Sequence, residues 1–218
     1  MPRAARIVIP GVAHHVTQRG NRQQAIFFND NDYCAYLNIL RIALDRHNTR
    51  CLAWCLMPNH VHLMLVPQTA DGLRATLASA HTTYAQRINQ QQKASGHLFQ
   101  GRFASYAMDD AHMMVAARYI ENNPVKAGKV ESAKDWRWSS ARAHIEQHDD
   151  GLTDIAALGQ HLPNWAAMLK VGLEAAEQVD GALLTGKPMG AADWLHLHGV
   201  TPTARRRGRP FSLNRDSR

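Results

Sequence analysis

The segment that most constrains the fold of this chain is CLAWCLMPNHVHLMLVP, residues 51–67. It holds two apolar runs, about 51–57 and 60–67, separated by Pro58-Asn59. Proline and asparagine interrupt strands and favour turns, so the pattern predicts two buried strands joined as a hairpin. The chain is therefore expected to build a sheet around residues 51–67.

The segments around the hairpin alternate between strand-like and helix-like patterns. The β-branched stretch GVAHHVTQRGN predicts a first strand near residues 12–18, before an Arg-Gly-Asn turn signal. Helical periodicity and end signals predict three helices, and a further strand is expected between the last two of them. In chain order, the helices are NDNDYCAYLNILRIALDRHN (29–48), DGLRATLASAHTTYAQRINQQQ (71–92) and DDAHMMVAARYIENNP (109–124), and the strand is HLFQGRFASYAM (97–108).

The resulting order, β-α-β-β-α-β-α, is the split βαβ pattern of α+β domains. It predicts a ferredoxin-like antiparallel sheet with helices on one side. After about residue 150 the sequence changes, since LTDIAALGQHL and NWAAMLKVGLEAAEQVDGALL indicate further helices and a Gly- and Arg-rich tail follows. We therefore expect one domain over 1–149, a small helical extension over 150–204 and a basic flexible tail over 205–218.

Composition excludes several classes of protein. No apolar run approaches the ~18 residues of a membrane span, and the N-terminus carries no apolar signal-peptide core. We therefore expect a cytoplasmic protein with no membrane partner, whose three cysteines are reduced thiols. Cys51 and Cys55 have the spacing of half a zinc site, but no second pair with metal-binding spacing accompanies them.

Positive charge is concentrated at the two ends of the chain, although the net charge of the whole is +7. The first 29 residues hold four arginines and no acidic residue, and residues 205–218 hold six arginines against Asp216. Basic ends on a body that is not basic suggest a polyanionic partner. Solvated, disordered ends explain the same charges equally well.

His60 and His62 stand out inside the second apolar run. Side chains two apart in a strand point to the same face, roughly 6.5–7 Å apart at ~3.3 Å per residue, so the two imidazoles can hold one divalent ion. Two polar histidines on the wet face of a sheet are the alternative. His196 and His198 have the same spacing, but DWLHLHG reads as a helix ending at Gly199, which places that pair on different faces.

The third predicted helix adds two polar residues to this picture. Tyr119 and Asn123 lie four residues apart and so share a helical face. Asn123 offers an oxygen that completes a site of two histidines and one amide, and Tyr119 beside a metal-polarised phosphate becomes a usable nucleophile. Alternatively, Tyr119 packs in the core and Asn123 caps the helix before Pro124. The other tyrosines have no amide four residues on in a comparable helix: Tyr33, Tyr36, Tyr84 and Tyr106.

At this point the sequence resembles a known family. MPNHVHLML looks like the His-hydrophobe-His strand of the HUH single-strand nucleases. Four further motifs in order resemble the REP-associated tyrosine transposases, which are relatives of the single-tyrosine HUH transposases of insertion sequences. The resemblance spans roughly residues 3–148, and its motifs are PGVAHHVTQRGNRQQAIF, GHLFQGRF, RYIENNPVKAG and WRWSSARAH.

The resemblance implies a catalytic domain that cleaves and rejoins single-stranded DNA at palindromic, REP-like hairpins. Carried over by position, it implies metal ligation by His60 and His62, a third ligand at Asn123, and Tyr119 as nucleophile in a transesterification that forms a 5′-phosphotyrosine. The expected cofactor is Mg²⁺ or Mn²⁺, with no small-molecule cofactor. The expected protein is a monomer or homodimer associated with the nucleoid. A domesticated hairpin-binding protein without activity, and a metal-dependent hydrolase acting on nucleotides, remain as rivals.

Arginines at both ends are the expected DNA contacts. Those around the first strand can bind phosphate or pair with guanine, and Arg102 lies among aromatic residues suited to stacking on unpaired bases. The tail contains Arg-Gly-Arg-Pro, which resembles the core of an AT-hook for the minor groove, although a nonspecific phosphate-binding tail fits as well. The full set is Arg3, Arg6, Arg19, Arg22, Arg102, Arg205, Arg206, Arg207 and Arg209.

Overall fold

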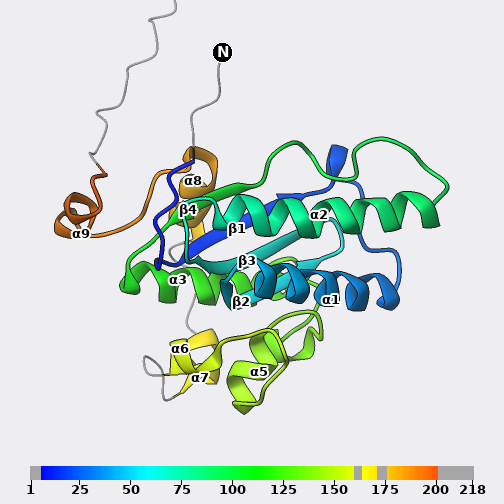
Figure 1. Ribbon diagram of the computed structural model, residues 1–218. Coiled ribbons are helices and arrows are strands. Elements are labelled where there is room, and N and C mark those ends of the chain that lie inside the picture. Colours follow the sequence, from blue (N-terminus) through cyan, green and yellow to red (C-terminus); the bar gives the residue numbers. More distant parts are fainter. Residues whose placement is uncertain (1–5, 160–163, 171–175, 201–218) are drawn as a thin grey trace, which may run out of the picture.

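The computed structural model describes residues 6–159, 164–170 and 176–200. A four-stranded sheet lies at its centre (Figure 1), in the order β2-β3-β1-β4 and with antiparallel neighbours throughout. This is the strand order of a ferredoxin-like domain, so the predicted α+β class and antiparallel sheet are confirmed. The strands are β1 (His14–Arg19), β2 (Thr49–Met57), β3 (His60–Pro67) and β4 (Ala104–Ala107).

The hairpin predicted around Pro58-Asn59 forms with those two residues at its turn. Met57 faces His60 across it, and the register continues through Trp54 and Leu63. Side chains alternate along β3. Val61, Leu63 and Leu65 lie in one hydrophobic cluster, the first cluster, and Met64 and Val66 lie in another, the second cluster. Both faces of the hairpin are therefore apolar over most of its length.

Two long helices cover the first face. Helix α1 (Asp30–Arg46) begins at Asn29, whose side chain accepts the backbone N–H of Asp32, a standard N-cap. Helix α2 (Gly72–Gln91) runs beside α1 (Figure 1). Their buried side chains pack on the apolar side chains of β3 and β1, and the largest of them are Tyr36, Leu40, Leu73, Leu77, Tyr84 and Ile88.

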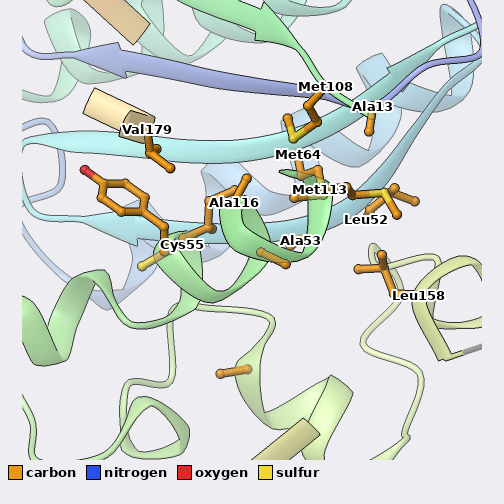
Figure 2. Close-up of a cluster of buried hydrophobic side chains, with 14 of the residues drawn as sticks. Ala13, Leu52, Ala53, Cys55, Met64, Met108, Met113, Ala116, Leu158 and Val179 are labelled. Carbon is orange, nitrogen blue, oxygen red and sulfur yellow. The ribbon is translucent and has the colours of Figure 1, made fainter. Parts of the chain in front are cut away.

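The opposite face is covered as well, which corrects the expectation that the helices lie on one side. Helix α3 (Asp110–Glu121) packs through Ala116 and Ile120 on Met64, in the second cluster (Figure 2). The cause is the double apolar pattern of the hairpin, because a strand with apolar residues at both parities must bury both faces.

Two predicted elements end differently in the structure. The strand expected over 97–108 is confined to β4. Residues 97–103 form bends, with an isolated bridge between Phe99 and Gly20, and Gly101 has a φ of 61°. The third helix stops at Glu121, and Asn123–Lys126 forms a separate short helix, α4. Pro124 lies in the first turn of α4, where its missing N–H costs no hydrogen bond.

Residues beyond 140 form further short helices. Helices α6 and α7 lie on the α3 side of the sheet, with Leu158 and Trp165 in the second hydrophobic cluster, and α8 packs there through Val179 and Ala182. The domain boundaries at 149 and 204 stay predictions. The helices are α5 (Ala141–Glu146), α6 (Ile155–Gly159), α7 (Trp165–Lys170), α8 (Ala176–Thr185) and α9 (Ala192–Leu197), and 3-10 turns span Asn21–Gln23 and Ala133–Asp135. Among the described residues, no helix is long and apolar enough to cross a membrane.

Candidate active site

The pair His60 and His62 lies on the α3 side of β3. Their ring centroids are 4.9 Å apart, and the rings meet edge to face. Both side chains lie on the same face of β3 as Met64, which packs in the second cluster. The imidazoles therefore point toward α3. In β1, Arg19 is the register partner of His60.

A third histidine, His15 on β1, was not predicted. Its Nε2 lies 2.9 Å from Nδ1 of His62, and its Nδ1 lies 3.3 Å from the hydroxyl of Tyr106. The alternation of β1 contained the signal, because Val16 faces the first cluster and its neighbour His15 must then face the other side. His15 thus lies beneath the predicted pair and orients one member of it.

Burial keeps these imidazoles neutral. It lowers the pKa of His15 to about 3, and together with the charge of Arg19 it lowers the pKa of His60 to about 4. Burial is the main cause that holds the pKa of His62 well below its usual range, and the neighbouring His15 and His60 lower it further. A neutral imidazole keeps a ring nitrogen lone pair, which is the form that binds metals.

Asn123 lies beside both histidines, but at the first position of α4 and not, as the sequence predicts, within the helix that carries Tyr119. Its side-chain Nδ2 donates to Nε2 of His62 at 3.2 Å, and the side chain also hydrogen-bonds with His60. The Nδ1 atom of each histidine is engaged elsewhere, with Asn59 Oδ1 at 2.7 Å for His60 and with His15 for His62. Engaging Nδ1 fixes the tautomer and makes Nε2 the acceptor, which in His62 takes the hydrogen bond of Asn123 and is the nitrogen that a metal would bind in its place.

These contacts fit a divalent cation held by His60, His62 and Asn123. The donor set has two imidazole nitrogens and one amide oxygen, which suits Mn²⁺ better than Mg²⁺. Within the described part of the chain, no group of three or more His, Cys, Asp or Glu side chains is arranged to hold a metal. The side chain of Asn123 is the further polar group that lies beside both histidines.

Tyr119 reaches the same place from α3. Its ring centroid is 5.6 Å from that of His62 and 5.8 Å from that of His15. The hydroxyl donates to Oδ1 of Asp180 on α8 at 2.6 Å. Burial, followed by this hydrogen bond to a carboxylate, raises the pKa of Tyr119 above its usual value. The tyrosine therefore rests as a neutral phenol.

The two histidines, Asn123 and Tyr119 line one pocket of about 750 Å³. Its wall contains three cationic side chains, from Arg19, Arg102 and Lys126, and one carboxylate, from Asp180. The cations exceed the carboxylate, so the pocket favours an anionic ligand such as a phosphodiester.

The other predicted arginines are placed differently. Arg6 is half-buried, stacks 3.7 Å over the ring of Phe103 and donates two hydrogen bonds to the carbonyl of that residue. Burial and the charge of Arg102 lower its pKa. Arg22 lies on the exposed turn after β1. Arg3, Arg205, Arg206, Arg207 and Arg209 lie outside the described residues.

A second hollow of about 600 Å³ adjoins the first and shares Gln18 and Arg102 with it. Phe99 and Phe103 line it and also pack, partly buried, on the first hydrophobic cluster. The aromatic side chains of the 97–103 segment therefore serve the core and a basic groove together.

The competing candidates do not form sites. His198 ends α9, and its Nδ1 is bonded to the carbonyl of Trp194, as expected for a helical His-x-His. Cys51 and Cys55 lie in different hydrophobic clusters on opposite faces of the sheet, so they cannot share a zinc ion.

The comparisons with known proteins agree with this geometry. An antiparallel sheet with a basic pocket, lined by two histidines and a tyrosine, is typical of a protein that binds an anionic ligand. Residues 10–123 match the family Transposase IS200 like, so the chain belongs to this family of DNA-transposing enzymes. The match includes His60, His62, Tyr119 and Asn123, and it ends before Lys126 and Asp180.

Two relatives are informative. A REP-associated tyrosine transposase from Haemophilus influenzae is 29% identical over 126 residues, which cover 51% of this chain and 72% of the relative. A solved structure of a REP-associated tyrosine transposase bound to a REP hairpin superposes with a TM-score of 0.59 at 21% identity, covering 71% of this chain and 90% of that one. The second likeness supports the fold.

Proposed function

We propose that this transposase cleaves and rejoins single-stranded DNA at palindromic hairpin elements, with Tyr119 as the nucleophile. The observation that carries the proposal is the meeting of Tyr119, His62 and Asn123 at the floor of one basic pocket. Binding alone does not require a buried tyrosine hydroxyl beside two neutral imidazoles. Transesterification at a phosphodiester uses all of these groups.

In the proposed reaction, the hydroxyl oxygen of Tyr119 attacks the scissile phosphorus. A 5′-phosphotyrosine forms and a 3′-hydroxyl is released, so the bond energy is conserved and a 3′-hydroxyl can later attack the adduct to rejoin the strand. A divalent cation, Mg²⁺ or Mn²⁺, bound by His60, His62 and Asn123 would polarise the phosphate as a Lewis acid. The protein holds those ligands neutral through burial and orients His62 through His15.

The surroundings of the site support a hairpin substrate. Arg19, Arg102 and Lys126 line the pocket and can neutralise phosphates along a strand that enters it. The segment 97–103 adds aromatic rings beside that path, on which unpaired bases can stack. The relative of similar fold is bound to a REP hairpin, which supports the same class of DNA here. Arg3, Arg6, Arg22 and the tail arginines Arg205, Arg206, Arg207 and Arg209 are proposed as additional DNA contacts.

A single chain suffices for this chemistry, because the histidines and the tyrosine of one protomer lie side by side. We therefore expect a monomer to be competent, whether or not the protein dimerises on DNA. An enzyme of this kind acts where the DNA lies, at the nucleoid in the cytoplasm.

The test is incubation with labelled single-stranded DNA that carries a hairpin from the flanks of the protein's own gene. Reactions with Mn²⁺ or with EDTA are run on a denaturing protein gel. The proposal expects a metal-dependent covalent adduct that is lost in Tyr119→Phe. Binding without an adduct would instead indicate a domesticated hairpin-binding protein, and DNA turnover without an adduct would indicate a hydrolase.

A further inference from the structure

Asp180 lies within hydrogen-bond distance of the hydroxyl oxygen of Tyr119. Its Oδ1 accepts the hydrogen bond of the Tyr119 hydroxyl at 2.6 Å. Asp180 lies on α8, in the segment that follows the part of the chain matched by the family. The contact therefore joins the C-terminal helical region to the predicted nucleophile.

Helix α8 is held firmly enough to place this carboxylate. Val179 and Ala182 are buried in the second hydrophobic cluster together with Tyr119 (Figure 2 labels Val179). Beyond the helix, the backbone N–H of Met189 donates to Ala107 at 2.8 Å, and the N–H of Asp109 donates back to Met189 at 3.0 Å. These bonds extend the edge of the sheet beside β4. Asp180 thus projects from a helix that is held by its buried face and by the backbone bonds of Met189 after it.

Lys126 supports the carboxylate from the opposite side. Its Nζ lies 3.6 Å from Oδ2 of Asp180 and 5.1 Å from the centre of the Tyr119 ring. Both charged side chains are about half exposed, so the pair is solvated and weak by itself. Its consequence is geometric: Lys126 engages Oδ2 and leaves Oδ1 for the tyrosine.

The pocket offers few other destinations for the tyrosine proton. Apart from Tyr119 itself, its titratable lining residues are two arginines, Lys126, the two histidines and Asp180. Arginine and lysine side chains offer hydrogen-bond donors and no acceptor, and the histidines are the metal ligands of the proposed function. Asp180 is the lining residue that already accepts a hydrogen bond from the Tyr119 hydroxyl, at 2.6 Å.

We infer that Asp180 is a catalytic residue that accepts the Tyr119 proton during strand cleavage and returns it during rejoining. As the bond between the tyrosine oxygen and phosphorus forms, the bond between phosphorus and the 3′ oxygen breaks, the tyrosine proton passes to Oδ1 of Asp180, and solvent protonates the leaving 3′ oxygen. In rejoining, the 3′-hydroxyl attacks, its proton goes to solvent, and Asp180 reprotonates the released tyrosine. The inference rests on the proposed function.

The test compares Asp180→Asn with wild type and with Asp193→Asn, an equal change of charge on exposed α9. Asparagine keeps the shape and a hydrogen-bond acceptor but is not a base, and thermal unfolding of each variant checks that the fold is retained. Adduct formation is measured in single turnover on hairpin DNA with Mn²⁺, alongside DNA affinity. We expect Asp180→Asn to slow adduct formation about 10²- to 10⁴-fold with affinity changed less than twofold, and Asp193→Asn to match wild type.

A second substrate separates proton acceptance from the alternatives. In DNA with sulfur in place of the bridging 3′ oxygen, the leaving thiolate needs no proton, so the Asp180→Asn defect should persist. Recovery of the variant on this DNA would show that Asp180 protonates the leaving group, and would overturn the inference. A rate equal to wild type on ordinary DNA would also overturn it. A faster rate would show that Asp180 restrains the tyrosine. Failure of wild type itself to form an adduct would reject the proposed function.

Discussion

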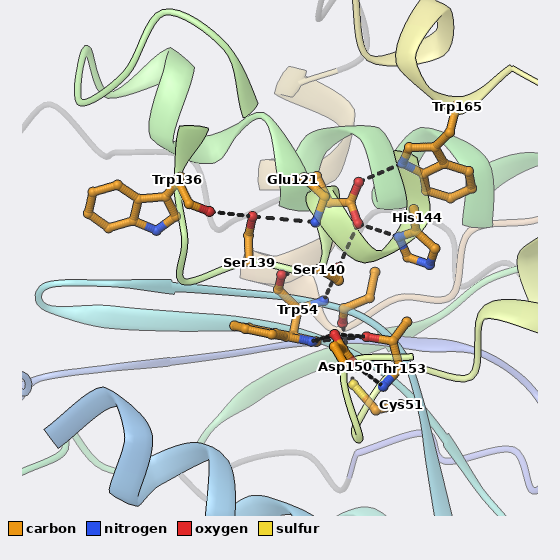
Figure 3. A network of polar contacts seen from close by, with 12 residues as sticks. Cys51, Trp54, Glu121, Trp136, Ser139, Ser140, His144, Asp150, Thr153 and Trp165 are labelled. Carbon is orange, nitrogen blue, oxygen red and sulfur yellow. Dashed lines mark hydrogen bonds and ion pairs between the residues drawn. The ribbon is translucent and has the colours of Figure 1, made fainter. Parts of the chain in front are cut away.

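The buried side chain of Glu121, the last residue of α3, yields the most quantitative prediction. Glu121 is fully buried two residues after Tyr119, where α3 gives way to α4. It accepts hydrogen bonds from Ser140 Oγ at 2.5 Å, His144 Nδ1 at 2.6 Å and Trp165 Nε1 at 2.6 Å (Figure 3). Ser140 lies at the start of α5 and His144 within it, and Trp165 belongs to α7. The side chain of Glu121 therefore ties α3 to α5 and to α7.

The cost of Glu121→Ala follows from which donors lose their only acceptor. Ser140 has a second acceptor in the carbonyl of Trp54, so its hydroxyl can turn. The N–H groups of His144 and Trp165 are left buried without a partner, and each such group costs about 1–3 kcal/mol. We expect the free energy of unfolding to fall by about 3–5 kcal/mol, as for other buried ionic groups that lose one partner. That is a large part of the roughly 5–15 kcal/mol typical of a domain.

The assay is denaturant unfolding of Glu121→Ala beside Glu146→Ala. Glu146 is an exposed residue of α5, with Arg142 at 4.0 Å, and its loss should cost less than about 1 kcal/mol. Under conditions where the protein remains folded, Glu121→Ala should also slow adduct formation, because the α3–α4 junction carries Tyr119 and Asn123. Equal stability of the two variants would refute the view that Glu121 secures this junction.

Three further predictions address the metal, the DNA and the pH dependence. Asn123→Ala should raise the Mn²⁺ concentration needed for half-maximal adduct formation at least tenfold while leaving DNA affinity intact, and an unchanged metal requirement would exclude the amide as a ligand. Arg102→Ala should reduce the slope of log affinity against log salt by about 1, whereas Arg41→Ala on exposed α1 should not. His14 accepts the N–H of Ile9 and donates to Val12 O, and burial lowers its pKa to about 4. Because the unfolded chain takes up this proton near pH 6.5, stability should fall as pH drops from 6.5 to 4. His14 alone contributes up to about 1.4 kcal/mol per pH unit to this loss, so the stability of His14→Gln should fall less steeply.

The fold followed from local patterns in the sequence. Apolar runs broken by Pro58-Asn59 specify the hairpin, and helical periodicity on either side fixes the order of elements. The placement of helices on both faces was missed, although the pattern of β3 contains it. Met64 and Val66 are as apolar as Leu63 and Leu65, and such a strand has no face suited to water.

The sequence predicted the site residues that are close to each other along the chain, but not the contact between distant segments. His60 and His62 are placed by the alternation of one strand, whereas Tyr119 and Asn123 are near in sequence but lie on α3 and α4. The structure brings the two pairs together. Asp180 could not be predicted, because it meets Tyr119 through the packing of a helix 61 residues away. No periodicity within a segment encodes such a contact.

The identity of the residue that becomes bonded to DNA tests the proposed function most directly. The adduct formed on hairpin DNA would be digested with nuclease and trypsin, and the nucleotide-bearing peptide identified by mass spectrometry. Tyr119 and Tyr106, the two tyrosines nearest His15, fall on different tryptic peptides, 119–126 and 103–118. We predict the phosphotyrosine on peptide 119–126. A nucleotide on peptide 103–118, or on no tyrosine at all, would contradict Tyr119 as the nucleophile.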